Sequence, residues 1–374
     1  MKKFIVALFV IFLIPNIAYA QESNEEAYNS VLSQYDLSFF EDRLGNEAYS
    51  YLERLGIDDF SFNSINSIGL NDVFEIITDI LSGKIQAPLK CCVGVMAFVI
   101  ISCLAKSVNP DNESFDGIFG AVASLIISTL ILSRLSVSVA ASVGALRIAA
   151  DFIYGFIPVF CAVCVASGNP TVAFSTNTLL LTLAQGLSFI ASNVFMPLIN
   201  CFLALGICSS IRHELHLNRL VSSLKQIITK GISFLFGVFV SVLSIKTAVA
   251  GRADMLGLRS IRFAVNTVVP VIGSSISEGL LSIQGYSSLV KTSVGIVGVV
   301  GIMLVFLPSI IETAVWRLLL SLCLIVSDIF EENTVSATLS ALRDSMLLIS
   351  VLLIMSMVTT VISLGIVIAA RGGV

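Results

Sequence analysis

Long apolar runs separated by short polar stretches fill this chain from about residue 87 onward. Apolar runs of this kind predict membrane-spanning helices, because one crossing needs about 20 mostly apolar residues. We expect an all-α polytopic membrane protein with about eight or nine crossings, some of them re-entrant or broken. The expected segments are Cys91–Ala105, Gly117–Ser133, Ser136–Ala150, Phe152–Ser167, two spans or a broken hairpin within Phe174–Ile211, Gly231–Ala250, a re-entrant or broken Ala264–Leu281, Val290–Ile311, Thr313–Ile329 and Met346–Ala370.

A basic stretch sets the expected orientation. Arg212–Lys230 carries four Lys or Arg, two His and one Glu, and the positive-inside rule places it at the cytoplasmic surface. The Gly-Arg-Ala-Asp turn that starts at Gly251 then falls outside, and Arg371 ends in the cytoplasm. We expect a cell-membrane location with several passes.

The first 86 residues have a different character. Residues 1–20 predict a signal peptide, with Lys2 and Lys3, an apolar core and Ala18-Tyr19-Ala20 as a cleavage site. An uncleaved anchor is the alternative, and both place residues 21–86 outside the cytoplasm. From Gln21 to Lys90 the chain has 13 Asp and Glu against four Lys and Arg. Short helices packed on the membrane domain, 87–374, or on a partner fit this segment, and so does a semi-ordered spacer.

Composition excludes several classes of function. Hydrophobic residues make up 56% of the chain and charged residues 12%, which argues against a soluble domain. The net charge of -4 gives no support to nucleic-acid binding. All eight Cys lie in or beside apolar segments and predict no disulfide framework. No phosphate loop, metal-ligand set or nucleophile and base pair is apparent, so we expect no cofactor, no metal and no enzyme.

Charged and polar residues are concentrated between Lys246 and Pro308. Each charge is costly near a bilayer, so it is expected to be paired, hydrated or functional. Pro270–Gly279 is too polar for a span that faces lipid, and Glu278 either forms a structural ion pair with Arg259 or Lys291 or lines a polar passage. The functional candidates in this stretch are Arg252, Asp254, Arg259, Pro270, Glu278 and Lys291.

Two spacings add to this picture. Gly295, Gly298 and Gly301 form a smooth stripe on one helix, which favours a packing face and leaves a pore lining or a subunit contact as the alternative. Leu146-Arg147 precedes Pro158 by the spacing with which Leu258-Arg259 precedes Pro270. An internal repeat around 135–211 and 247–330 is one interpretation of this match, and chance in an apolar sequence is the other.

The same stretch carries a resemblance to a known family. Its order is Gly-Arg-x-Asp, Leu-Arg-x-x-x-Phe, Val-Pro-Val-Ile-Gly, Glu278, and Ser-Leu-Val-Lys-Thr-Ser-Val-Gly-Ile-x-Gly. In this order and in overall layout the chain resembles the stage III sporulation protein AE family. It departs from the family at Val326-Ser327-Asp328, where members often carry Gln-Pro, so no role of that pair is transferred.

The resemblance implies a function that the residue pattern alone does not. It implies a membrane component of a secretion-like channel complex between mother cell and forespore, located in the mother-cell membrane around the forespore. The implied partners are the complex's other membrane and ring-forming proteins and an ATPase. A secondary transporter with a polar passage near Glu278 is the alternative.

Overall fold

The computed structural model describes residues 32–33, 38–57, 70–107, 113–166, 178–211, 217–268, 273–330 and 332–369. Within these residues every regular element is a helix, which confirms the predicted all-α class. The predicted signal peptide, Pro270 and the two histidines lie outside the described residues. Side chains between 245 and 289 also lie outside the description, although the backbone there is helical except at 269–272.

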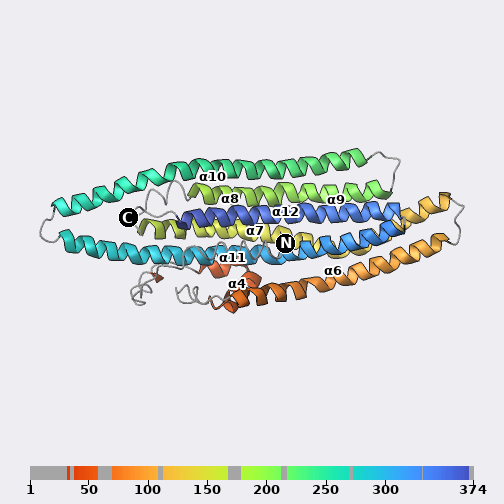
Figure 1. Ribbon diagram of the computed structural model, residues 1–374, viewed down its shortest axis with the longest axis horizontal. Coiled ribbons are helices and arrows are strands. Elements are labelled where there is room, and N and C mark those ends of the chain that lie inside the picture. The colour runs from red at the N-terminus through yellow and green to blue at the C-terminus, as the bar shows by residue number, and fades with distance from the viewer. Residues whose placement is uncertain are drawn as a thin grey trace.

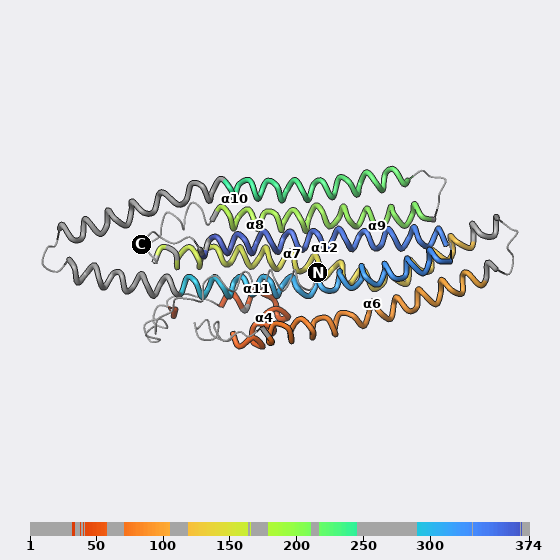
Figure 2. Tube along the Cα trace, viewed as in Figure 1, coloured from red at the N-terminus to blue at the C-terminus, as the bar shows by residue number. Residues whose placement is uncertain are grey.

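Long helices lie side by side in an elongated bundle (Figure 1). Two short helices, α3 and α4, pack on one flank, and the tube view shows the same arrangement (Figure 2). The bounds are α3 Phe39–Leu44, α4 Asn46–Arg54, α6 Leu70–Ser107, α7 Glu113–Ala166, α8 Thr178–Ile190, the π-helical η3 Ala191–Phe195, α9 Met196–Ile211, α10 Asn218–Val268, α11 Gly273–Ile329 and α12 Asn333–Ala369.

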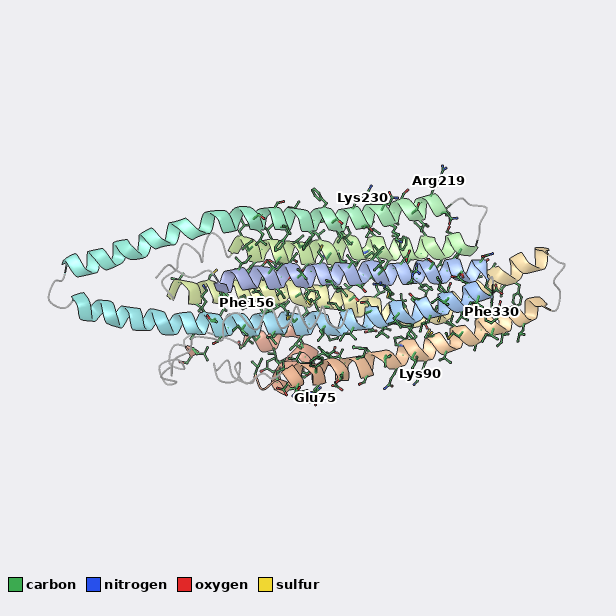
Figure 3. All side chains as sticks on the ribbon, in the orientation of Figure 1. Glu75, Lys90, Phe156, Arg219, Lys230 and Phe330 are labelled. Carbon is green, nitrogen blue, oxygen red and sulfur yellow. The ribbon has the colours of Figure 1, made fainter. Side chains whose placement is uncertain are left out.

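Helix α11 is the centre of the bundle. In its most apolar stretch 94% of the residues are buried, compared with 72% in α12, 28% in α6 and 17% in α10. Charged side chains mark the outer edges, with Arg219 and Lys230 on α10 and Glu75 and Lys90 on α6, while Phe156 of α7 lies between these edges (Figure 3). A helix that is apolar on all sides is expected in such a central position.

The short helices α3 and α4 pack against the long ones. Phe40 of α3 is 1% exposed, and its ring centroid lies 5.3 Å from that of Phe152 and 6.1 Å from that of Phe156, both on α7. Gly45 separates the two helices with a φ of 76°, a conformation that favours glycine. For residues 38–57, helices packed on the membrane domain are therefore what the structure shows, and not a spacer.

Three predicted segments, Gly117–Ser133, Ser136–Ala150 and Phe152–Ser167, are parts of a single helix, α7. The prediction of separate segments was wrong because the charged residues Arg134 and Asp151 were interpreted as boundaries. Both side chains are exposed on the continuous helix, as is that of Arg147. A single charged residue does not end a helix, since each backbone group keeps its partner one turn away.

The predicted hairpin or pair of spans within Phe174–Ile211 was also wrong. The chain continues in one direction through α8, η3 and α9. The stretch does contain an irregularity, the π-helical turn Ala191–Phe195 just before Pro197. Proline has no backbone N–H to donate, so a local change in the hydrogen-bond pattern is expected there. Within this turn the Asn193 side chain donates to the carbonyl of Phe189 at 2.9 Å.

Other predicted breaks lie within continuous helices as well. Gly251–Asp254 is helical backbone in α10 and not a turn, and the predicted spans Val290–Ile311 and Thr313–Ile329 are both parts of α11. The predicted boundary at residue 86 falls inside α6, and α12 begins at Asn333, before the predicted Met346.

Merging these segments lowers the number of candidate spans. By length and composition, the described residues contain six helices that could span a membrane, compared with the eight or nine crossings expected from the sequence.

Candidate functional site: a polar cluster around Glu312

Of the predicted candidates, Lys291 and the three glycines have described side-chain surroundings. Lys291 lies on α11 and is 3% exposed. Arg252, Asp254 and Arg259 lie on α10 and Glu278 lies on α11, but their side chains are outside the description, as is Pro270 entirely. The geometry of the predicted set is therefore not part of the described site.

The glycine stripe contacts three different elements. A Cβ atom added at Gly298 would lie 2.9 Å from the ring of Phe156 on α7, and one at Gly301 would lie 2.9 Å from Leu44 on α3. At Gly295 an added Cβ would collide with Ile368 on α12. Successive glycines three residues apart turn by about 60° around the helix, which explains why each meets another neighbour.

Glu312 lies on α11, whose apolar stretch is the most buried of the described spans, and is held by two other helices. Its side chain is 14% exposed. Ser138 of α7 donates a short hydrogen bond to Oε1, and Nζ of Lys84 on α6 lies 3.9 Å from Oε2. Trp316, one turn further along α11, donates from Nε1 to Oγ of Ser138 at 2.8 Å. Both carboxylate oxygens thus have partners, which is what a charge among apolar helices requires.

Lys84 links this cluster to the N-terminal helices. Its Nζ lies 3.5 Å from Oε1 of Glu47 on α4 as well as 3.9 Å from Glu312. The exposed fractions rise along the chain of charges, from 14% at Glu312 through 31% at Lys84 to 58% at Glu47. The three residues form a row of charges that runs from the exposed Glu47 on α4 to the largely buried Glu312 on α11.

A second ion pair holds α4 on α6. Nη1 of Arg54 donates to Asp79 at 2.6 Å. This hydrogen bond raises the pKa of Arg54, and burial together with the carboxylates of Glu47 and Asp79 raises the pKa of Tyr51. Both residues keep their neutral-pH protonation states, so α4 presents a fixed pattern of charge beside Lys84.

Hydroxyl groups form smaller contacts between the helices. Oγ1 of Thr338 on α12 lies 2.5 Å from Oγ of Ser124 on α7 and 2.6 Å from Oγ of Ser210 on α9. Ser350 of α12 donates to Thr313 of α11 at 2.9 Å. Buried hydrogen bonds between membrane helices fix their register more than they add stability.

The structure also brings two cysteines together that the sequence did not pair. The sulfur atoms of Cys92 on α6 and Cys323 on α11 lie 2.8 Å apart, both residues are buried, and both thiols are free. Within the described residues no group of three or more His, Cys, Asp or Glu side chains could hold a metal ion.

Sequence reasoning missed Glu312 as a site residue. It was interpreted as the boundary between the predicted segments Val290–Ile311 and Thr313–Ile329. The signal that could have identified it is its position as the one acidic residue between Lys291 and Asp328. Its partners on α6 and α7 are more than 170 residues away in the chain, and no local pattern indicates them.

Comparison with known proteins gives one family. The sequence profile of the family described as stage III sporulation protein AE matches residues 57–371. Stage III sporulation protein AE of Bacillus subtilis (strain 168) is 25% identical over 179 residues, which is 48% of this chain and 45% of that protein. The chain thus spans about half the length of this curated relative in the match. No solved structure matches the chain.

Proposed function

The chain belongs to the stage III sporulation protein AE family, and we propose that it is a membrane component of a secretion-like channel complex joining mother cell and forespore during sporulation. The observation that carries this proposal is the extent of the family match. It runs from residue 57 to residue 371 and therefore includes all six long apolar helices. A sporulation role is thereby attached to the membrane bundle itself, and not to a separate domain.

The tight packing inside the bundle favours a solute passage that lies outside it. The central stretch of α11 is 94% buried, and large apolar side chains such as Phe306 on α11 and Phe156 on its neighbour α7, both fully buried, fill the interior. In the part of the chain that the structure describes, an interior packed in this way leaves no room for a solute. We therefore place the conduit of the complex between subunits, with this bundle as part of its wall.

The proposed partners follow from the same reasoning. A wall subunit needs other membrane and ring-forming proteins to close a channel. Energy for transport would come from an ATPase partner, since the sequence carries no phosphate-binding loop of its own. The proposed location is the mother-cell membrane that surrounds the forespore.

Co-purification from sporulating cells tests this proposal. A tagged full-length chain is extracted in mild detergent, and mass spectrometry identifies the proteins that accompany it. We expect an ATPase and ring-forming proteins among them. Recovery of the chain alone, under conditions that preserve an unrelated membrane complex from the same cells, would contradict the channel role.

Two acidic residues test where function lies in the chain. We expect Glu278→Ala to lower the yield of heat-resistant spores while the protein still inserts in the membrane. Glu312→Gln, which keeps the shape of the side chain, is the comparison within the described bundle. Wild-type sporulation with Glu278→Ala would remove that residue from the candidate site.

A second candidate function is an autonomous secondary transporter. The observation that favours it is the Glu312–Lys84 pair, because ionisable groups within membrane spans often serve in proton or ion relays. The discriminating measurement is solute uptake by vesicles that contain only the purified chain. Uptake with a pH dependence that Glu278→Gln or Glu312→Gln abolishes would favour the transporter over the channel component.

A further inference from the structure

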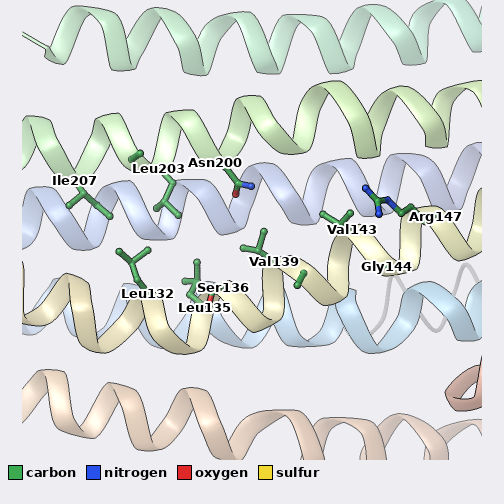
Figure 4. Close-up of a pocket in the computed structure, with 12 residues that line it drawn as sticks. Leu132, Leu135, Ser136, Val139, Val143, Gly144, Arg147, Asn200, Leu203 and Ile207 are labelled. Atoms are coloured by element: carbon green, nitrogen blue, oxygen red, sulfur yellow. The ribbon is translucent and has the colours of Figure 1, made fainter.

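An apolar groove of about 690 Å³ lies between α7 and α9 (Figure 4). Its walls are mostly aliphatic, with Leu132 and Ile207 near one end and Val143 near the other. The volume lies in the range of sites for small amphiphiles. A groove on the outer surface of a membrane bundle is open to lipid.

A cation lies at one end of this groove. The guanidinium of Arg147 is exposed, and the figure places it beyond Val143 at the end opposite Ile207 (Figure 4). Among the described residues no acidic side chain forms an ion pair with it, and this includes Asp151 one turn further along α7. A cation without an anionic partner beside an apolar channel is complementary to an amphiphile with a negative head.

The level of Arg147 in the bundle fits a headgroup position. A Cβ added at Gly45, between α3 and α4, would lie 3.4 Å from Ile148, the residue after Arg147. Asp42, Arg43 and Glu47, which flank Gly45, are exposed. Exposed charges need water or lipid headgroups, and such charges beside Ile148 suit a headgroup at the level of Arg147.

From that level the groove runs along α7 toward Leu132. The distance is about 22 Å at the rise of an α-helix, which is comparable to one lipid of a single leaflet when the hydrocarbon core is about 30 Å thick. Asn200 lies between Leu203 and Arg147 along the groove (Figure 4). Its amide can donate to the ester oxygens of a lipid, below the phosphate.

We propose that this groove binds an anionic phospholipid, with the phosphate at Arg147 and an acyl chain along α7 and α9 toward Leu132 and Ile207. The site is independent of the proposed channel role, since it depends only on the bundle and its surrounding bilayer. Its chemistry selects a negative head, because the zwitterionic choline head presents a second cation toward Arg147.

Lipid binding to the purified full-length chain tests the proposal. Native mass spectrometry measures the binding of added phosphatidylglycerol and phosphatidylcholine to delipidated protein. We expect phosphatidylglycerol to bind about tenfold more tightly, because both lipids offer a phosphate to Arg147 but the choline ammonium adds repulsion with the guanidinium. Arg147→Gln removes this preference. Arg134→Gln, an exposed arginine on the same helix outside the groove, keeps it.

A second variant separates the contribution of the groove to lipid binding from that of the charge on Arg147. Ala140 lines the groove, and Ala140→Trp fills it, so both lipids should bind more weakly while Arg147 is intact. An unchanged preference for phosphatidylglycerol in Arg147→Gln, or an equal loss in Arg134→Gln, overturns the proposal. It is also overturned if Arg147→Gln leaves lipid binding intact but loses a co-purifying membrane protein, since the cation then serves a partner helix.

Discussion

Helices α10 and α11 follow one another in the chain and have similar lengths, 51 and 57 residues, but occupy opposite positions in the bundle. The most apolar stretch of α11 is 94% buried, and that of α10 is 17% buried. Both would be read from hydropathy as membrane spans. The comparison separates an apolar helix surface that packs against protein from one that faces the outside of the bundle.

The pattern along each helix explains the difference. On α10 the exposed Ile227, Phe234 and Val238 lie on one face, and the buried Ile228 and Ile232 lie on another. On α11 the residues from Val290 to Ile311 are buried or nearly buried on all faces. A one-sided pattern indicates a peripheral helix, and an apolar pattern on every side indicates a central one.

The packing of the described bundle therefore depends on α11 far more than on the described part of α10. The central helix carries Glu312, the glycine stripe and the contacts to α3, α6, α7 and α12. Matched substitutions on the two helices can test this division.

The largest difference is expected for a phenylalanine pair. Phe306→Ala on α11 removes a fully buried ring, and Phe234→Ala on α10 removes one that is 70% exposed. We expect the first to lower the free energy of unfolding by about 3 kcal/mol and the second by less than about 0.5 kcal/mol. Unfolding in mild detergent, followed by circular dichroism, measures both. Equal losses would mean that α10 is packed against protein.

The next difference uses the glycines. Gly298→Leu would drive a side chain into Phe156, whose ring stacks on Phe160 with centroids 5.1 Å apart, so the ring cannot move freely. We expect a loss of about 2–3 kcal/mol from overpacking. Gly237→Leu on α10 is the control, since an added Cβ there meets nothing within 4 Å, and it should be neutral or stabilising. A tolerated Gly298→Leu would argue against close contact of α11 with α7.

The pair around Glu312 is expected to have an intermediate effect. Glu312→Ala leaves Lys84 without its inner partner and Ser138 without its acceptor. We expect a loss of about 2 kcal/mol, below the range for a fully buried pair because Lys84 is 31% exposed and keeps Glu47. Glu312→Gln should recover part of it by accepting from Ser138. If both variants unfold as the wild type does, the cluster has no structural role.

The general architecture was predictable from the sequence, because it depends on composition and local pattern. Apolar runs indicate membrane helices wherever they occur, and the predicted all-α class is confirmed. The acidic segment was predicted to form short helices or a spacer, and the amphipathic spacing of Phe40, Leu44 and Leu52 agrees with the buried face observed.

Continuity of the helices was not predictable from local pattern. Arg147 and Glu312 look alike in a hydropathy plot, as polar interruptions of apolar runs. One is exposed on α7 and the other is satisfied by Ser138 and Lys84 from distant parts of the chain. Whether a charge ends a span depends on such partners, which only the tertiary structure supplies.

The smallest effect is expected for the ion pair that attaches α10. Nζ of Lys225 lies 2.5 Å from Oδ2 of Asp344 on α12, and Arg343 donates to the other oxygen of the same carboxylate at 3.1 Å. Lys225 is 40% exposed, so solvent screens the pair, and we expect a coupling energy of about 0.5 kcal/mol in a double-mutant cycle of Lys225→Gln and Asp344→Asn. The same cycle on Lys84 and Glu312 should give a larger value, because Glu312 lies deeper among the helices. A coupling energy at Lys225 and Asp344 larger than that at Lys84 and Glu312 would contradict the comparison. It would place α10 among the elements that hold the bundle together.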